Sequence, residues 1–112
     1  MNIENNVWIG HKVLIAGGNA EITIEENVDI APCVTLVAGT HEKFTIEGRA
    51  AGRGYCLPIV IGKGSWIGAN ATILGGVTLG KCTLVAAGAM VTKNFPGNNI
   101  IAGVPARVIK IN

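Results

Sequence analysis

Residues 61–92 read IGKGSWIGANATILGGVTLGKCTLVAAGAMVT and contain a regular hydrophobic period. The aliphatic residue that recurs at every sixth position is Ile61, Ile67, Ile73, Leu79, Val85 and Val91. Neither a helix nor an ordinary strand produces a sustained period of six. Hexapeptide periodicity indicates a solenoid of stacked coils, so we expect an all-β fold.

The period extends backwards through Ile9, Ile15, Ile24, Ile30 and Leu36. It is shifted by three positions between Ile15 and Ile24, in the glycine-rich residues 17–20, which are typical of a turn. With three hexapeptides in each coil, we expect about four to five coils whose every-sixth side chains point inward. A column of this kind buries little surface for its length, so we also expect self-association.

Two interruptions break the period. Residues 42–60 contain Gly48, Gly52, Gly54 and Pro58, which favours an extended loop that leaves the solenoid. After Val91 the repeat decays, and the apolar residues 100–111 are expected to form a short C-terminal cap. The length favours a single domain over residues 1–112.

Composition and targeting signals limit the class of protein. No apolar stretch is long enough for a membrane span, and the N-terminus lacks the basic and apolar regions of a signal peptide. The three cysteines, Cys33, Cys56 and Cys82, are an odd number without paired spacing, which is typical of free thiols. We therefore expect a cytoplasmic protein.

The charge is divided unevenly along the chain. All seven acidic residues lie within residues 1–47, and residues 48–112 contain seven basic residues and no acid. This favours either a solvated basic face or a site for a phosphorylated small molecule in the second half. Nucleic acid is disfavoured as a partner, because the basic residues are spread singly and aromatic residues are few.

The segment IGKGSWIGANATILGGVTLG, residues 61–80, resembles the core of the hexapeptide-repeat acetyltransferases, and the tails at residues 86–93 and 103–110 are similar to theirs. The resemblance is greatest to the maltose and galactoside O-acetyltransferases and to the sugar acetyltransferases of polysaccharide clusters. It implies a left-handed parallel β-helix, a homotrimer, and acetyl-CoA bound between subunits. The chain departs from the family at two places. Gly75 stands where the family frequently has proline, and the family's long N-terminal segment is absent. We therefore expect the acceptor pocket to differ.

His41 is the residue expected to act as the catalytic base, because the resemblance implies a histidine where the repeat stops. A hydroxyl is a poor nucleophile unless its proton is removed, and a neutral imidazole, with an ordinary pKa near 6.5, suits that role. Asp29, Glu42 or a backbone carbonyl could each orient the ring. The alternatives are a surface histidine without a role, catalysis by His11, and a reactive thiol at Cys56. Two histidines are too few for a three-histidine zinc site in one chain, and we expect no metal.

The resemblance also implies a set of coenzyme contacts. Trp66 is expected to line the coenzyme channel, or to pack at the subunit interface. The small side chains of Ala69 and Ala87 would let the pantetheine arm lie against main-chain amides. Lys93 and Arg107 match positions that meet the phosphates of the coenzyme, where cations suit the anion.

The acceptor is expected to be a small molecule, with a sugar hydroxyl as the leading candidate. Tyr55 and Arg49 are the expected substrate-binding residues, and Arg53 is a further cation in the same loop. The function that follows is acetyl-CoA-dependent O-acetyl transfer. The alternatives are a non-catalytic scaffold, or transfer to an amino sugar, a serine hydroxyl or an antibiotic.

Overall fold

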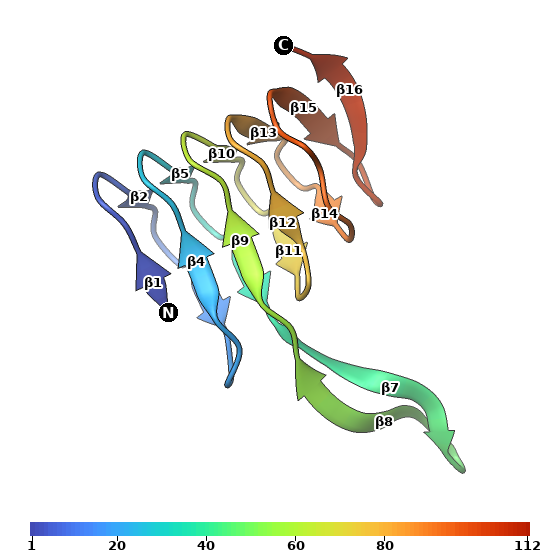
Figure 1. Ribbon diagram of the computed structural model, residues 1–112. Coiled ribbons are helices and arrows are strands. Elements are labelled where there is room, and N and C mark those ends of the chain that lie inside the picture. Colours follow the sequence, from blue (N-terminus) through green and yellow to red (C-terminus); the bar gives the residue numbers. More distant parts are fainter.

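The computed structural model describes all of residues 1–112, and the chain winds into a triangular column from which one hairpin projects (Figure 1). Three parallel sheets form the sides of the column. The first sheet contains β1 (Asn2–Ile3), β4 (Ile22–Ile24), β9 (Ile59–Ile61) and β12 (Thr78–Leu79). The second contains β2 (Trp8–Ile9), β5 (Asp29–Ile30), β10 (Trp66–Ile67), β13 (Thr83–Val85), β15 (Asn99–Ala102) and the antiparallel β16 (Arg107–Ile111). The third contains β3 (Leu14–Ala16), β6 (Thr35–Val37), β11 (Thr72–Leu74) and β14 (Met90–Val91).

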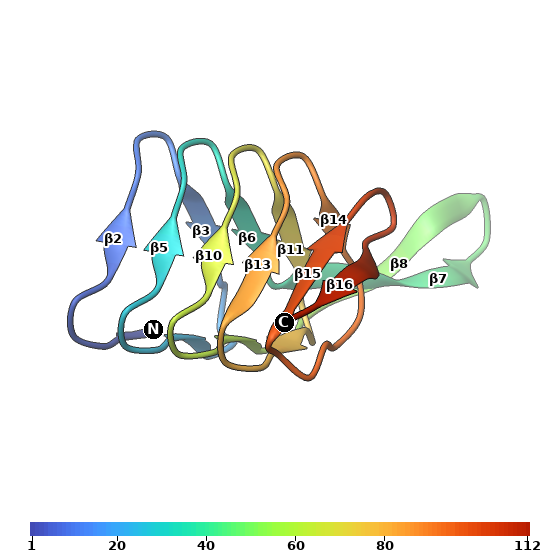
Figure 2. The same cartoon turned by 90° about the horizontal axis from the view of Figure 1, so that it is seen from above.

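Each turn of the chain adds one strand to each sheet, and the turns follow a left-handed path. In Figure 2 the strands of the second sheet run upward on the near side, and those of the third run downward on the far side as the chain advances from the N-terminus. The expectation of a left-handed parallel β-helix is therefore confirmed. This handedness opposes the right-handed rule for most parallel crossovers, and it was implied by the family resemblance rather than by the spacing of the hexapeptides.

The core is a stack of aliphatic side chains along the axis of the column. Ile67 and Val85 pair across β10 and β13, as do Ile73 and Val91 across β11 and β14, and all four are fully buried. The remaining buried members of the six-residue series are Ile24, Ile30, Leu36, Ile61 and Leu79. Their burial confirms the inward direction predicted from the period. Burial contributes roughly 0.8 kcal/mol for each CH₂ group before entropy is subtracted.

The corners of the column are tight turns that need a left-handed backbone. At the corner between the first and second sheets, the residues with positive φ are Asn6, Asn27, Gly64, Cys82, Gly97 and Asn98. Hydrogen bonds join successive turns here, for example from the Gly64 amide to the Glu26 carbonyl at 3.0 Å. Glycine and asparagine adopt this conformation at least steric cost, which explains their frequency at these positions.

Apart from the turn that carries the hairpin, the first turn of the column is longer than the later ones, and its extra residues lie in the corner formed by residues 17–20. The predicted shift of the period is therefore confirmed. Ile9 is an inward member of the series but is 38% exposed. The reason is that β2 is an edge strand, so only β5 pairs with it.

The interruption of the repeat is a hairpin rather than a structureless loop. β7 (Gly39–Ile46) and β8 (Arg49–Cys56) pair as antiparallel strands that extend away from the column (Figure 1). The predicted departure from the solenoid is confirmed, but it begins at Gly39 and includes His41. The strands were missed because their glycines break the alternation that identifies a strand. A tight turn closes the hairpin at Gly48, which has φ of 78°.

The C-terminal end is closed as expected. β16 folds back on β15 as an antiparallel strand, with Ala102 opposite Arg107 and Asn99 opposite Ile111. Every element of the chain is a strand, and no helix is present that could cross a membrane.

Candidate active site

A hollow of about 590 Å³ lies where the hairpin meets the column. Its lining residues are Asn19, Gly39, Thr40, His41, Gly54, Tyr55 and Cys56. Asn19 comes from the corner of the first turn, and the others come from the base of β7 and β8. The volume lies within the range of small-molecule sites.

The ring of His41 is oriented by a backbone carbonyl. Its Nδ1 atom lies 2.9 Å from the carbonyl oxygen of Gly52. Because a carbonyl can only accept, Nδ1 carries the proton in this bond, and Nε2 of the neutral ring is left as an unprotonated acceptor. Among the three orienting groups considered from the sequence, the structure places this carbonyl against the ring. Glu42 instead lies 3.6 Å from Arg53, and Asp29 lies on the second sheet.

Gly52 has no room for a side chain. It is buried, and a Cβ atom there would collide with Oγ1 of Thr45 and lie 2.9 Å from the carbonyl oxygen of Glu42. The close approach of β7 and β8 therefore requires glycine at this position. Gly54 lies directly opposite His41 in the pairing, and a Cβ atom there would lie 3.3 Å from Cε1 of the ring. Because neither glycine has a side chain, β7 and β8 approach closely enough for the Gly52 carbonyl to bond to the ring of His41.

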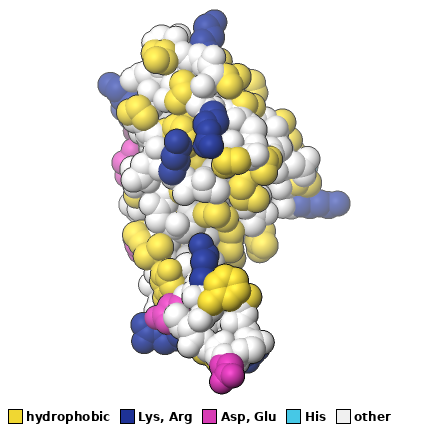
Figure 3. Space-filling view, turned by 90° about the vertical axis from the view of Figure 1, so that its right-hand side faces the viewer, with side chains coloured by type: hydrophobic (Ala, Val, Ile, Leu, Met, Phe, Trp, Pro, Cys, Tyr) yellow, Lys and Arg dark blue, Asp and Glu magenta, His cyan; other side chains and the backbone are white.

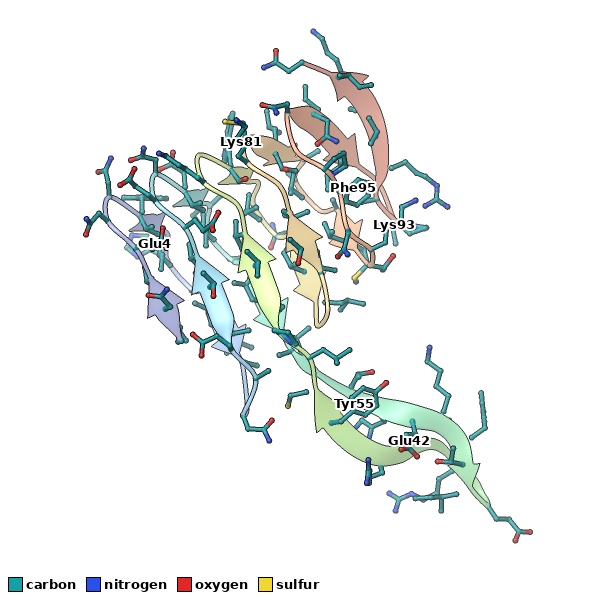
Figure 4. All side chains as sticks on the ribbon, viewed as in Figure 1. Glu4, Glu42, Tyr55, Lys81, Lys93 and Phe95 are labelled. Atoms are coloured by element: carbon teal, nitrogen blue, oxygen red, sulfur yellow. The ribbon has the colours of Figure 1, made fainter.

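The two expected acceptor contacts lie at opposite ends of the hairpin. Tyr55 lines the hollow beside His41 and is 42% exposed; Figure 4 shows it at the base of the hairpin. Arg49 lies at the tip, where it lines a separate hollow of about 380 Å³ together with Phe44. The structure thus brings Tyr55, and not Arg49, to His41.

Trp66 lies on the outer surface of the second sheet and is 55% exposed. Its neighbours in the pairing of the sheet are Asp29 on β5 and Leu84 on β13. His41 projects from the corner between the third and first sheets, so the core of the column lies between it and Trp66. One chain alone does not bring the two side chains together.

Ala69 and Ala87 lie one above the other at the corner between the second and third sheets. The Gly88 amide donates to the Ala69 carbonyl at 2.8 Å, which joins the two turns. Neither the Ala69 nor the Ala87 amide donates to another backbone group. This corner therefore presents free N–H donors beside methyl side chains. Gly68 must be glycine here, because its Cβ atom would lie 2.7 Å from the Ala87 nitrogen.

Lys93 and Arg107 are exposed cations near the C-terminal end. Nζ of Lys93 lies 5.6 Å from the centre of the Phe95 ring, which is a cation–π contact. Figure 4 labels the two side chains. Arg107 makes only a long bond to the Ala106 carbonyl, at 3.4 Å. The face in Figure 3 carries several Lys and Arg side chains and broad hydrophobic areas, whereas its acidic side chains lie on the hairpin and at one margin of the column.

Two residues that line the hollow, Asn19 and Thr40, were not predicted from the sequence, and neither was Gly52 as the source of the carbonyl that orients His41. Asn19 belongs to the lengthened corner of the first turn, so the shift in the period was the signal that marked it. The carbonyl of Gly52 left no such signal, because backbone groups have no residue type. Cys56 is half-buried, and its sulfur fills the space over Gly18.

The alternative base considered from the sequence, His11, lies away from this hollow. His11 is exposed at the corner between the second and third sheets. The structure contains no group of three or more His, Cys, Asp or Glu side chains that could hold a metal.

Residues 58–93 match the family model described as bacterial transferase hexapeptide with six repeats. These residues carry the hexapeptide repeats of that family. The resemblance inferred from the sequence is thereby confirmed. Among the relatives of this hexapeptide-repeat chain, galactoside O-acetyltransferase from Escherichia coli K12 is 46% identical over 89 residues, which are 80% of this chain and 43% of that protein.

Two solved structures have folds similar to that of this chain. The hexapeptide-repeat acetyltransferase VCA0836 from Vibrio cholerae, solved with acetyl coenzyme A, has a TM-score of 0.89 and 34% identity, covering 97% of this chain and 58% of that one. A maltose O-acetyltransferase from Clostridium difficile 630 has a TM-score of 0.69 and 31% identity, covering 99% of this chain and 66% of that one. The chain spans about half of the length of the curated relatives it matches.

Proposed function

We propose that residues 1–112 form the catalytic domain of a cytoplasmic O-acetyltransferase. It moves an acetyl group from acetyl-CoA to a hydroxyl of a small acceptor, a sugar by analogy with the galactoside and maltose enzymes. The observation that carries this proposal is the bond from His41 to the Gly52 carbonyl. It leaves Nε2 free to take a proton at the edge of a hollow of suitable size.

The corner at Ala69 and Ala87 fits a thin, extended arm such as pantetheine. Its two amides have no backbone partner and could bond to the amide groups of that arm. The methyl side chains leave room for close approach. Lys93 and Arg107, in a half of the chain without acids, would hold the phosphates. Bound there, acetyl-CoA supplies the activated acetyl group as a thioester.

A site that uses both His41 and Trp66 requires two copies of the chain, because the core separates them in one copy. The outer surface of the third sheet supports association, because its strands carry no charged residue; the outward side chains include Leu14, Val37, Leu74 and Met90. A closed ring of three copies would repeat one such contact around an axis. We therefore infer a homotrimer with composite sites.

In the proposed reaction, Nε2 of His41 accepts the proton of the acceptor hydroxyl as its oxygen attacks the thioester carbonyl. The Gly52 carbonyl holds the ring and stabilises the imidazolium that results. The C–S bond of the thioester then breaks, and the imidazolium returns the proton to the departing sulfur, so that coenzyme A leaves as the thiol and the acceptor keeps the acetyl group. Trp66 of the neighbouring copy, through its indole N–H, or a free corner amide donates to the carbonyl oxygen as negative charge develops there. Tyr55 bounds the acceptor side of the hollow.

The test is the His41→Ala variant, with His11→Ala as the matched control at another corner. We expect His41→Ala to lower acetyl transfer by roughly 10²-fold to 10⁴-fold, with acetyl-CoA still raising the melting temperature. Near wild-type transfer by a folded, trimeric His41→Ala protein would exclude His41 as the base. Absence of any thermal shift with acetyl-CoA in the unmodified protein would favour the non-catalytic scaffold.

A further inference from the structure

A second hollow, of about 410 Å³, lies on the outer surface of the second sheet at its N-terminal end. It is lined by Asn6, Val7, Trp8, Asn27 and Asp29, and we call it the Trp8–Asp29 hollow. It shares no lining residue with the hollow beside His41. None of the residues expected to contact substrate or coenzyme lies in it.

The pairing of the second sheet places a carboxylate between two indoles. Asp29 on β5 pairs with Trp8 on β2 on one side and with Trp66 on β10 on the other. Adjacent strands are about 4.8 Å apart, so the indoles start about 10 Å from each other along the column. Trp8 and Trp66 are each 55% exposed. Two large apolar side chains are therefore exposed close together on the outer surface of the second sheet.

Asp29 is the one acidic residue of the column whose side chain has no partner. Glu4 accepts from the Glu26 amide at 3.0 Å, and Glu25 accepts from the Lys63 amide at 3.0 Å. Glu26 lies 3.3 Å from Nζ of Lys63, and Glu21 lies 3.6 Å from the N-terminal amine. These acids have structural roles at the turns, whereas Asp29 makes no ion pair and no side-chain hydrogen bond. Its oxygens are free to accept from a ligand.

Asn6 and Asn27 add polar groups at the floor of the hollow. Nδ2 of Asn6 donates to Oδ1 of Asn27 at 2.8 Å, which orients both amides and leaves Nδ2 of Asn27 and Oδ1 of Asn6 unpaired. The left-handed backbone at both positions explains why asparagine occurs there. The left-handed backbone does not explain why Trp8 and Asp29 occur in the wall of the hollow, because those two residues lie on strands.

The charge around the hollow excludes a phosphorylated ligand. Asp29 is at its wall, Glu4 lies at the same end of the column (Figure 4), and residues 1–47 hold all seven acids of the chain. A phosphate would be repelled here, so the coenzyme's phosphates belong elsewhere. A flat indole, a carboxylate and paired amides together match a ring with one apolar face and several hydroxyl donors.

We propose that the Trp8–Asp29 hollow binds a pyranose ring of the acceptor. The ring stacks on the indole of Trp8, its hydroxyls donate to Asp29, and Asn27 and Asn6 bond to the remaining oxygens. The hollow lies in the same row of side chains as Trp66. In the composite site inferred above, the ring therefore lies between this row and the hollow beside His41 of the neighbouring copy, where the reacting hydroxyl meets Nε2. This inference rests on the proposed acetyl transfer for its role, but the sugar contact itself is testable without activity.

The binding experiment uses Trp8→Ala and Asp29→Asn, with Leu84→Ala as a control in the same row on the far side of Trp66. Trp8 and Asp29 are exposed and Leu84 is half-buried, so thermal unfolding followed by circular dichroism checks that each variant folds. Methyl galactoside and maltose serve as probes, and ligand-observed saturation-transfer NMR reads out binding. We expect saturable binding to the unmodified protein and to Leu84→Ala, and a loss of about tenfold or more in Trp8→Ala and Asp29→Asn.

The kinetic experiment separates this inference from the proposed function. In both hollow variants the KM for the sugar should rise about tenfold, while the KM for acetyl-CoA and the coenzyme-induced thermal shift stay unchanged. Sugar binding that is lost in Trp8→Ala, in a protein that never transfers acetyl, would support the site and refute the activity. Sugar binding that both variants retain would overturn the site, whatever the activity. Glucosamine that binds more tightly than the neutral sugars, with the gain lost in Asp29→Asn, would also overturn it in favour of a cationic ligand.

Discussion

The Nδ1 atom of His41 lies 2.9 Å from the carbonyl oxygen of Gly52, across the two strands of the hairpin. The bond selects the tautomer of the neutral ring and sets its orientation, so the hairpin is part of the proposed catalytic apparatus. The carbonyl replaces the carboxylate that completes many histidine-based sites. It performs the orienting role without adding a buried charge.

The first prediction concerns this bond. Gly52→Ala should displace β7 from β8, because the new Cβ atom would meet Thr45 and the backbone of Glu42. We expect kcat to fall by about 10²-fold, since a misplaced catalytic group costs that much, while the column keeps its melting temperature. Steady-state kinetics and circular dichroism measure the two effects. The control is Ala51→Ser at the neighbouring exposed position, and equal kcat values for the two variants would refute the orienting role of the carbonyl.

The second prediction concerns the coenzyme's phosphates. Lys93→Gln should weaken coenzyme A binding on the order of tenfold to a hundredfold, because a hydrogen bond to a charged group contributes about 1.5–3 kcal/mol. Lys81→Gln removes the same charge at a different corner of the column (Figure 4) and should have little effect. Isothermal titration calorimetry at low and high salt checks both, and the Lys93 effect should shrink as salt screens the charges. Equal losses in the two variants would indicate a general charge effect only.

The third prediction concerns the aliphatic stack. Ile73→Ala should lower the free energy of unfolding by about 2–5 kcal/mol, because Ile73 is fully buried and its neighbours along the axis cannot collapse into the cavity. Ile109→Ala removes the same atoms from a side chain that is 64% exposed and should change it by about 0.5 kcal/mol or less. Denaturant titration at one protein concentration compares them. A similar cost at both positions would contradict the inward assignment of the six-residue series.

The fourth prediction concerns a turn. Cys33 has φ of 65° and is exposed. Cys33→Val should cost about 1–2 kcal/mol, because a branched side chain is strained in the left-handed region. Cys33→Asn should be neutral or slightly stabilising, since asparagine tolerates this conformation. Thermal unfolding of the two variants tests the corner geometry, and equal melting temperatures would contradict it.

The fold was readable because its decisive feature is local. Ile61, Ile67 and Ile73 occupy the same position in successive hexapeptides, so the period predicts which side chains face the axis. The hairpin was only partly readable. Its boundaries were displaced, and its strands were hidden, because Gly52 and Gly54 are present for close approach rather than for strand propensity.

The sequence by itself determined the solenoid, its inward rows, the departure of the chain near His41 and the acid-free second half, because each is a property of spacing or composition along the chain. Only the tertiary structure decided the partner of His41, the separation of His41 from Trp66, and the placement of Asp29 between Trp8 and Trp66. Those relationships join residues from different turns or opposite strands. The pairing register sets them, and no pattern within a single hexapeptide records which residues a neighbouring strand will place alongside it.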